Sequence, residues 1–207
     1  MENNQNLCPF CFSILEKPGR CPCCGHQIGE PRHGIQELPV GTILDRKYLL
    51  GMVLGQGGFG ITYLAFDLNL RMKVAIKEYF PGGLVVRNTQ MVTPTTQATV
   101  GYFQKGVDAF FREAQFLARF QTHPNIVHIS SFFRENNTAY FVMEYVEGKS
   151  LTKFIDENGG RLPWEKIEQI ISPILDALEV LHANGILHRD IAPDNICLEK
   201  KRKYKIA

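Results

Sequence analysis

The sequence Gly55-Gln56-Gly57-Gly58-Phe59-Gly60 decides the fold, because it joins two segments that alternate as β-strands do, residues 48–54 and 61–67. Glycines in such a turn let backbone N–H groups approach phosphate oxygens with no Cβ in the way. A dinucleotide-binding loop would lead from a strand into a helix, so the β-like segment after Gly60 excludes that fold. By itself the turn also fits an ordinary glycine-rich hairpin.

A lysine and a glutamate follow in segments that can bring them together. Val74-Ala75-Ile76-Lys77 places the lysine on a third predicted strand, residues 72–79, among apolar residues, where burial is costly unless the charge is paired. Glu113 lies in a segment whose apolar residues recur at helical spacing, from Val107 to Ala118. We expect Glu113 to pair with Lys77, and an exposed helix would explain Glu113 equally well.

A carboxylate and an amide stand close together in His188-Arg189-Asp190-Ile191-Ala192-Pro193-Asp194-Asn195. This motif follows a predicted helix, whose apolar stripe from Ile167 to Leu181 contains Pro173. Asp190 can accept a proton or orient a hydroxyl group, and Asn195 offers an amide oxygen to a hard cation such as Mg²⁺. These residue types are suited to the handling of phosphate groups.

Five motifs, in their order along residues 48–207, resemble those of a protein kinase, above all those of the bacterial serine/threonine kinases. They are the glycine-rich turn, Val74-Ala75-Ile76-Lys77, the helix glutamate Glu113, Val142-Met143-Glu144-Tyr145 and the motif ending at Asn195. The resemblance implies an α+β, bilobal fold. The N-lobe, to about residue 146, would have a five-stranded antiparallel sheet and one helix, and the partial helical C-lobe would be 147–207. The last two strands of the N-lobe sheet are predicted at 126–134 and 138–145.

The resemblance also assigns roles in the expected active site. Asp190 would orient the substrate hydroxyl, which would be a serine or threonine of a protein, and Asn195 would bind Mg²⁺. Lys77 would hold the α- and β-phosphates of ATP, and Glu113 would position Lys77. The other residues expected around ATP are Leu54, Gly55, Gln56, Gly57, Gly58, Phe59, Gly60, Thr62, Ala75, Met143, Glu144, Val146 and Cys197.

Three features depart from the kinase pattern. Thr62 replaces the usual valine over adenine, and Ala192 replaces the lysine that serine/threonine kinases place two residues after the catalytic aspartate. Loss of such a cation typically costs on the order of 10² to 10³ in rate. The chain ends at Ala207, where Asp-Phe-Gly is expected next, so we expect these 207 residues to be part of a longer enzyme and inactive alone. A pseudokinase, or a truncated scaffold that holds nucleotide or a partner without turnover, is the alternative.

A small zinc ribbon is predicted at residues 1–29. Cys8-Pro9-Phe10-Cys11 and Cys21-Pro22-Cys23-Cys24 form two C-x₂-C pairs, and thiolates at this spacing suit tetrahedral Zn²⁺. We assign Cys8, Cys11, Cys21 and Cys24 as ligands, with Cys23 or His26 as substitutes for Cys24. Disulfides, a redox dithiol and an Fe–S site are the alternatives, and disulfides are disfavoured in the cytoplasm. A module this short would take its folding energy from the metal.

The composition excludes other classes of function. The formal net charge is +2, which argues for neither nucleic acid nor a membrane surface, and no apolar run is long enough to cross a bilayer. The first residues lack the features of a signal peptide, so we expect a cytoplasmic protein. Residues 30–43 are predicted to be a linker, 44–207 the kinase domain, and 80–105 a loop or weak hairpin with no assigned chemical role. Because this segment lies between Lys77 and Glu113, an influence on the helix that carries Glu113 is the alternative to an ornamental loop. The expected partners are ATP and a protein substrate, and the ribbon has too few basic and aromatic residues to predict nucleic-acid binding.

Overall fold

The computed structural model describes residues 7–17, 19–27, 34–120, 122–188, 190–199 and 204–206. Part of the predicted linker, Arg189 and the basic run 200–203 therefore lie outside the described residues. The chain divides into two compact units. The first unit comprises Met1–Phe116 and Ile129–Tyr145, and the second comprises Leu117–His128 and Val146–Ala207.

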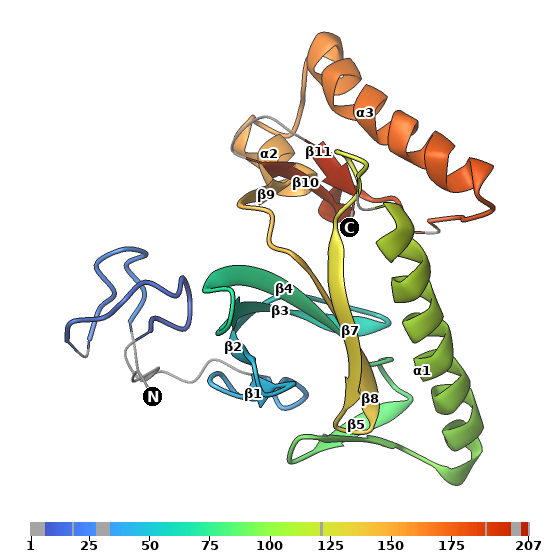
Figure 1. Cartoon of the computed structure of the whole chain (residues 1–207). Coiled ribbons are helices and arrows are strands. Elements are labelled where there is room, and N and C mark those ends of the chain that lie inside the picture. The colour runs from blue at the N-terminus through green and yellow to red at the C-terminus, as the bar shows by residue number, and fades with distance from the viewer. Residues whose placement is uncertain are drawn as a thin grey trace. The chain divides into compact units, whose positions relative to one another are not determined.

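The first unit is built on a curled antiparallel sheet with the strand order β1-β2-β3-β4-β8-β7 (Figure 1). The five predicted strands are confirmed, but the sheet has six, because a short strand pairs Ile43 with Leu49 at its edge. Two residues are too few to show an alternating pattern in sequence. The strands are β1 (Ile43–Leu44), β2 (Tyr48–Gly57), β3 (Gly60–Asp67), β4 (Met72–Tyr79), β7 (Ile129–Glu135) and β8 (Thr138–Glu144).

One long helix, α1 (Gln97–Leu117), covers one face of this sheet (Figure 1). Its aromatic side chains stack on those of the strands: the Phe110 and Phe141 rings lie 4.9 Å apart, and those of Phe103 and Tyr79 lie 5.8 Å apart. The helix begins well before Val107, so the prediction of a loop up to residue 105 is wrong for its last part. The earlier part is the predicted hairpin, formed by β5 (Val85–Asn88) and β6 (Met91–Pro94).

The two-residue turn between β7 and β8 follows from its sequence. Asn136 and Asn137 have φ values of 51° and 60°, and Glu135 pairs directly with Thr138. Two consecutive residues with positive φ match the right-handed twist of a hairpin, and asparagine tolerates this conformation better than most residues. The predicted hairpin at this position is confirmed.

The second unit combines helices with a small sheet. Ser150 caps α2 (Leu151–Glu157) by accepting a hydrogen bond from the Lys153 N–H, and α3 (Trp164–Ala183) runs through Pro173. The sheet has the antiparallel order β11-β10-β9, from β9 (Gly148–Ser150), β10 (Ile196–Glu199) and β11 (Tyr204–Ile206). Short 3₁₀ turns, η2 (Ala118–Phe120) and η3 (Pro193–Asn195), complete the described elements. The core of this unit is formed mainly by Leu151, Ile170, Ile174, Ala177, Leu181, Ile196 and Ile206.

Among the described residues, no helix combines the length and the apolar character needed to span a membrane.

Candidate active site and cysteine cluster

The sheet register gathers several predicted nucleotide-binding residues on one face. Lys77 on β4 lies directly between Thr62 of β3 and Phe141 of β8, and Ala75 lies opposite Met143. Residues opposite each other in an antiparallel pair, and those two apart along a strand, share a face. Thr62, Ala75, Lys77 and Met143 therefore form one continuous surface, on the side that α1 covers. Glu144 follows at the end of β8, opposite Val74.

The glycine-rich turn divides into open and packed positions. Gly57 pairs with Gly60 across the turn, and the Phe59 side chain between them is 77% exposed. A Cβ at Gly60 would overlap the Glu78 carbonyl oxygen, so glycine is required there by the neighbouring strand. A Cβ at Gly55, Gly57 or Gly58 would meet no atom within 4 Å. The backbone at these three glycines is open, as a site for phosphate groups requires.

The predicted pair of Lys77 and Glu113 is not formed. The Lys77 ammonium lies 5.8 Å from the centre of the Phe141 ring, and Glu113 is exposed on α1. Within the part of the chain that the structure describes, these two side chains make no ion pair with each other. Their pairing stays a prediction for another state of the domain.

In the second unit, the structure brings Asp190 and Asn195 together. The Asn195 side-chain N–H₂ donates to the Asp190 carboxylate Oδ2 at 2.9 Å and to the Asp190 carbonyl at 2.8 Å. The turn η3 sets this distance, because its Asn195 N–H donates to the Ala192 carbonyl at 2.9 Å. The amide nitrogen is thereby used, so the Asn195 Oδ1 atom is left as an oxygen ligand of the kind that Mg²⁺ prefers, and the Asp190 Oδ1 atom is left as a hydrogen-bond acceptor.

Two further predicted residues belong to the second unit. Cys197 is half-buried on β10, where it pairs with Lys205 of β11 and Ser150 of β9. Val146 is half-buried in the segment before β9. The remaining predicted positions, Leu54, Gly55 and Gln56, lie on β2 of the first unit, with Leu54 exposed beside an irregularity in the β2–β3 register.

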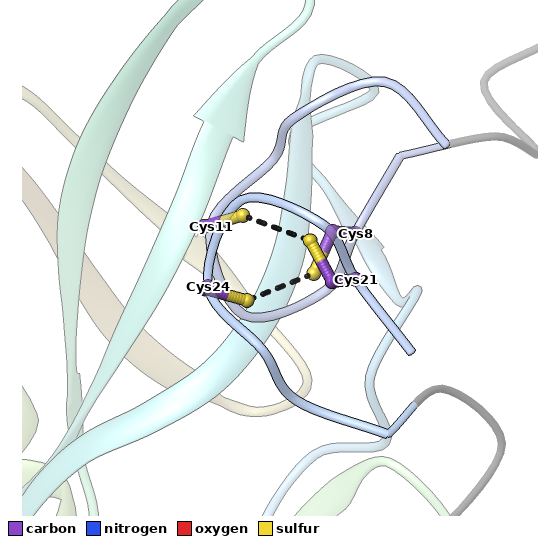
Figure 2. A group of neighbouring side chains, drawn as sticks. All are labelled: Cys8, Cys11, Cys21 and Cys24. Carbon is purple, nitrogen blue, oxygen red and sulfur yellow. Dashed lines mark hydrogen bonds between the residues drawn. The ribbon is translucent and has the colours of Figure 1, made fainter. Parts of the chain in front are cut away.

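The N-terminal cysteines form a compact cluster (Figure 2). The sulfurs of Cys8, Cys11, Cys21 and Cys24 all lie within 4.8 Å of one another. The Cys8–Cys24 distance is 3.6 Å and the Cys11–Cys21 distance is 3.7 Å. Tetrahedral Zn–S bonds of about 2.3 Å place sulfurs about 3.8 Å apart, so the four thiols fit a zinc ion. All four are free thiols, which does not match the disulfide alternative.

Two equivalent turns build this cluster. The Phe12 N–H donates to the Cys8 carbonyl at 2.7 Å, and the Gly25 N–H donates to the Cys21 carbonyl at 2.9 Å. Phe12 and Gly25 both have positive φ, 56° and 74°. Each C-x₂-C pair is thus a tight turn closed by the following residue. Cys23 is exposed, and neither it nor His26 belongs to the cluster, so neither replaces Cys24.

The local electrostatics favour a cation at the cluster. A hydrogen bond from the Ser13 hydroxyl, at 3.3 Å, is the main reason why the pKa of Cys21 falls to about 5. Burial raises the pKa of Cys24 to about 12. Four neighbouring thiols cannot all ionise without a positive charge between them, and metal binding supplies that charge.

The cysteine cluster also contacts the sheet, which was missed in the analysis of the sequence. The Met52 N–H on β2 donates to the Pro9 carbonyl at 3.1 Å, and the buried Phe12 ring lies 5.4 Å from the ring of Phe66 on β3. A Cβ at Gly51 would overlap Pro9 and come within 2.8 Å of Phe12. Gly51 was the available signal: a glycine inside an apolar strand marks a bulge or a close backbone approach.

Comparison with known proteins identifies relatives of the part of the chain that follows the cysteine cluster. Residues 48–207 match the family described as protein kinase domain. The serine/threonine-protein kinase PksC of Streptomyces coelicolor is 35% identical over 167 residues, which are 77% of this chain and 27% of PksC. The chain therefore spans well under two thirds of that relative.

Solved structures show the same likeness. The structure "PpkA-294 apo form" has a TM-score of 0.75 and 32% identity, and the match covers 83% of this chain and 60% of that one. The structure of Rad53 1-466 in complex with AMP-PNP has a TM-score of 0.61 and 26% identity, and covers 78% and 38% of the two chains. The family match, the register around Lys77 and the Asp190–Asn195 pair converge: the chain belongs to the protein kinase family, and its kinase domain is homologous to serine/threonine kinases.

Proposed function

We propose that this domain binds ATP with Mg²⁺ and serves the transfer of the γ-phosphoryl group to a serine or threonine hydroxyl of a protein. The observation that carries the proposal is the contact between Asn195 and Asp190, which holds the carboxylate of Asp190 at 2.9 Å from the amide nitrogen. One Asp190 oxygen is fixed by this bond, so the other is free to accept a hydrogen bond from a substrate hydroxyl. The similarity to a kinase structure that contains AMP-PNP supports the choice of nucleotide.

In the proposed reaction, the substrate oxygen attacks the γ-phosphorus, the bond to the β-phosphate oxygen breaks, and ADP leaves. Asp190 orients the hydroxyl and accepts its proton. Lys77 neutralises charge on the α- and β-phosphates, and the open backbone at Gly55, Gly57 and Gly58 surrounds the phosphates. Mg²⁺ bound by Asn195 would supply further positive charge to the phosphate oxygens.

A nucleotide-binding scaffold without turnover is the second candidate. Two observations favour it: Ala192 supplies no cation near Asp190, and the Lys77 ammonium rests over Phe141. Under this proposal the domain binds ATP and changes its partners or its conformation, and no phosphate is transferred.

The test separates binding from transfer. ATP binding is measured by calorimetry on the 207-residue chain, and transfer of labelled phosphate to protein is measured on the polypeptide encoded by the complete reading frame. We expect Asp190→Ala to abolish transfer and to leave ATP binding in place. Asp194→Ala is the matched control, because Asp194 is an exposed carboxylate of the same turn. Equal transfer by wild type and Asp190→Ala would refute the mechanism, and binding without any transfer would favour the scaffold.

We also propose that Cys8, Cys11, Cys21 and Cys24 bind one structural Zn²⁺. The sulfur distances support this proposal, and the zinc content of Cys24→Ser compared with that of Cys23→Ser tests it.

A further inference from the structure

The residue after Lys77 is a completely buried glutamate. Glu78 has 0% exposure and forms an ion pair with Arg87 at 2.6 Å, whose side chain is 2% exposed. The hydroxyls of Tyr63 and Tyr140 donate to its two carboxylate oxygens at 2.9 and 2.6 Å. Burial raises the pKa of both tyrosines, so they stay protonated and remain donors. The carboxylate is fully satisfied.

Arg87 is satisfied as thoroughly as its partner. It lies on β5 of the hairpin and donates to the carbonyls of Gln36 and Gln90 at 2.8 and 2.9 Å. Its guanidinium also lies 5.0 Å from the centre of the Phe80 ring. A buried ion pair is retained without a large penalty only when such additional bonds compensate for lost hydration. The hairpin is therefore anchored to the sheet by a specific polar network.

This network lies directly behind the predicted ATP-binding surface. Successive residues of a strand point to opposite faces, so Glu78 holds the back of β4 at the point where Lys77 faces the front. The same segment also reaches the glycine-rich turn. The Phe80 N–H donates to the Phe59 carbonyl and the Gly82 N–H donates to the Gly58 carbonyl, each at 3.0 Å.

We propose that residues 80–94, here called the strap, position the glycine-rich turn and Lys77 for nucleotide binding. Arg87 and Gly82 act as positioning residues: Arg87 anchors the strap through Glu78, and the Gly82 N–H holds the tip of the turn. Turn carbonyls beyond the end of a ladder ordinarily bond to water, whereas here they bond to the strap. The inference rests on the proposed binding of ATP and replaces the view of this segment as a loop without a role.

The first test uses two substitutions at one position in the 207-residue chain. Gly82→Pro removes the N–H that bonds to Gly58, whereas Gly82→Ala keeps it, and an alanine Cβ would come no closer than 3.9 Å to the Gly58 oxygen. We expect Gly82→Pro to raise the Kd for MgATP by about 2- to 10-fold, the range for one lost hydrogen bond, and Gly82→Ala to bind as wild type does. Hydrogen exchange of residues 57–60 and of Phe80, measured without nucleotide, should accelerate in Gly82→Pro alone.

The second test addresses the anchor. The double variant Glu78→Gln/Arg87→Met removes both charges and leaves no unpaired ion in the core. We expect it to weaken MgATP binding and to accelerate exchange at residues 57–60. Arg134→Met is the matched control, because it removes an arginine from an exposed ion pair with Asp108. Binding is measured well below the unfolding temperature of each variant.

The outcomes separate the strap from the proposed function. If Gly82→Pro and Gly82→Ala show equal Kd and equal exchange, the strap does not position the turn and the inference is wrong. If the wild-type chain does not bind MgATP, the proposed function fails at that point. In that case the rate of hydrogen exchange at residues 57–60 alone decides whether the strap positions the glycine-rich turn, because this rate is measured without any ligand.

Discussion

At the scale of single residues, a glycine inside a helix can mark a close tertiary contact. Gly101 and Gly106 both belong to α1, and Gly101 lies in the last part of the segment that was predicted to be a loop. Gly106 is needed because a Cβ there would overlap the Tyr79 side chain, which is itself held by a stacked contact with Phe103 and a tilted contact with Phe110. Helix propensity cannot reveal this, because the reason for the glycine is a tertiary contact.

The two helix glycines should respond to alanine in opposite directions. Gly106→Ala is expected to destabilise the protein by about 1–3 kcal/mol, as overpacking does, even though alanine favours helices. Gly101→Ala, where a Cβ would meet no atom within 4 Å, should stabilise by about 0.5–1 kcal/mol. Urea denaturation of both variants measures the difference. Equal effects would show that α1 does not approach Tyr79 closely.

At the scale of elements, sequence patterns predicted the strands and turns whose structure depends on residues that are close together in the chain. The alternation of β2, β3, β4 and β8, and the turn residues Asn136 and Asn137, were sufficient to place five of the six strands of the main sheet. The Asp190–Asn195 contact also follows from a short motif, since a single 3₁₀ turn joins the two residues. The hairpin of the strap was predicted but its anchoring was not, because the ion pair of Arg87 with Glu78 depends on the fold that surrounds it.

The contact between the cysteine turns and β2 can be tested with a pair of substitutions, one on each side of it. Gly51→Ala would push a Cβ into Pro9 and Phe12, and Phe12→Ala would remove the ring that packs near Phe66. Since both substitutions break one contact, their effects on the free energy of unfolding should be less than additive by about 0.5–3 kcal/mol. A double-mutant cycle from urea denaturation measures this coupling. Strict additivity would indicate that the cysteine turns and β2 are energetically independent.

At the scale of the whole molecule, the cysteine turns differ from the rest of the chain in what stabilises them. Among the described residues, their buried cluster contains only Cys8, Leu15 and Cys21, with Phe10, Cys11 and Cys24 packed against it. The second unit, in contrast, has a core of large aliphatic side chains such as Ile170, Ile174 and Leu181. The apolar burial in the turns is too small to offset the conformational entropy of ordering them, so a metal ion is the expected source of stability.

Removal of the metal should therefore unfold one part of the molecule and spare another. We expect wild type and Cys23→Ser to contain one zinc ion per chain by mass spectrometry, because Cys23 is exposed and outside the cluster, and Cys24→Ser to contain far less. A chelator should expose the Phe12 and Gly25 amides to hydrogen exchange while amides of α3 stay protected, since α3 packs in its own core. Full zinc in Cys24→Ser would refute the four-thiol site, and simultaneous loss of protection in α3 would show that the metal stabilises the entire chain.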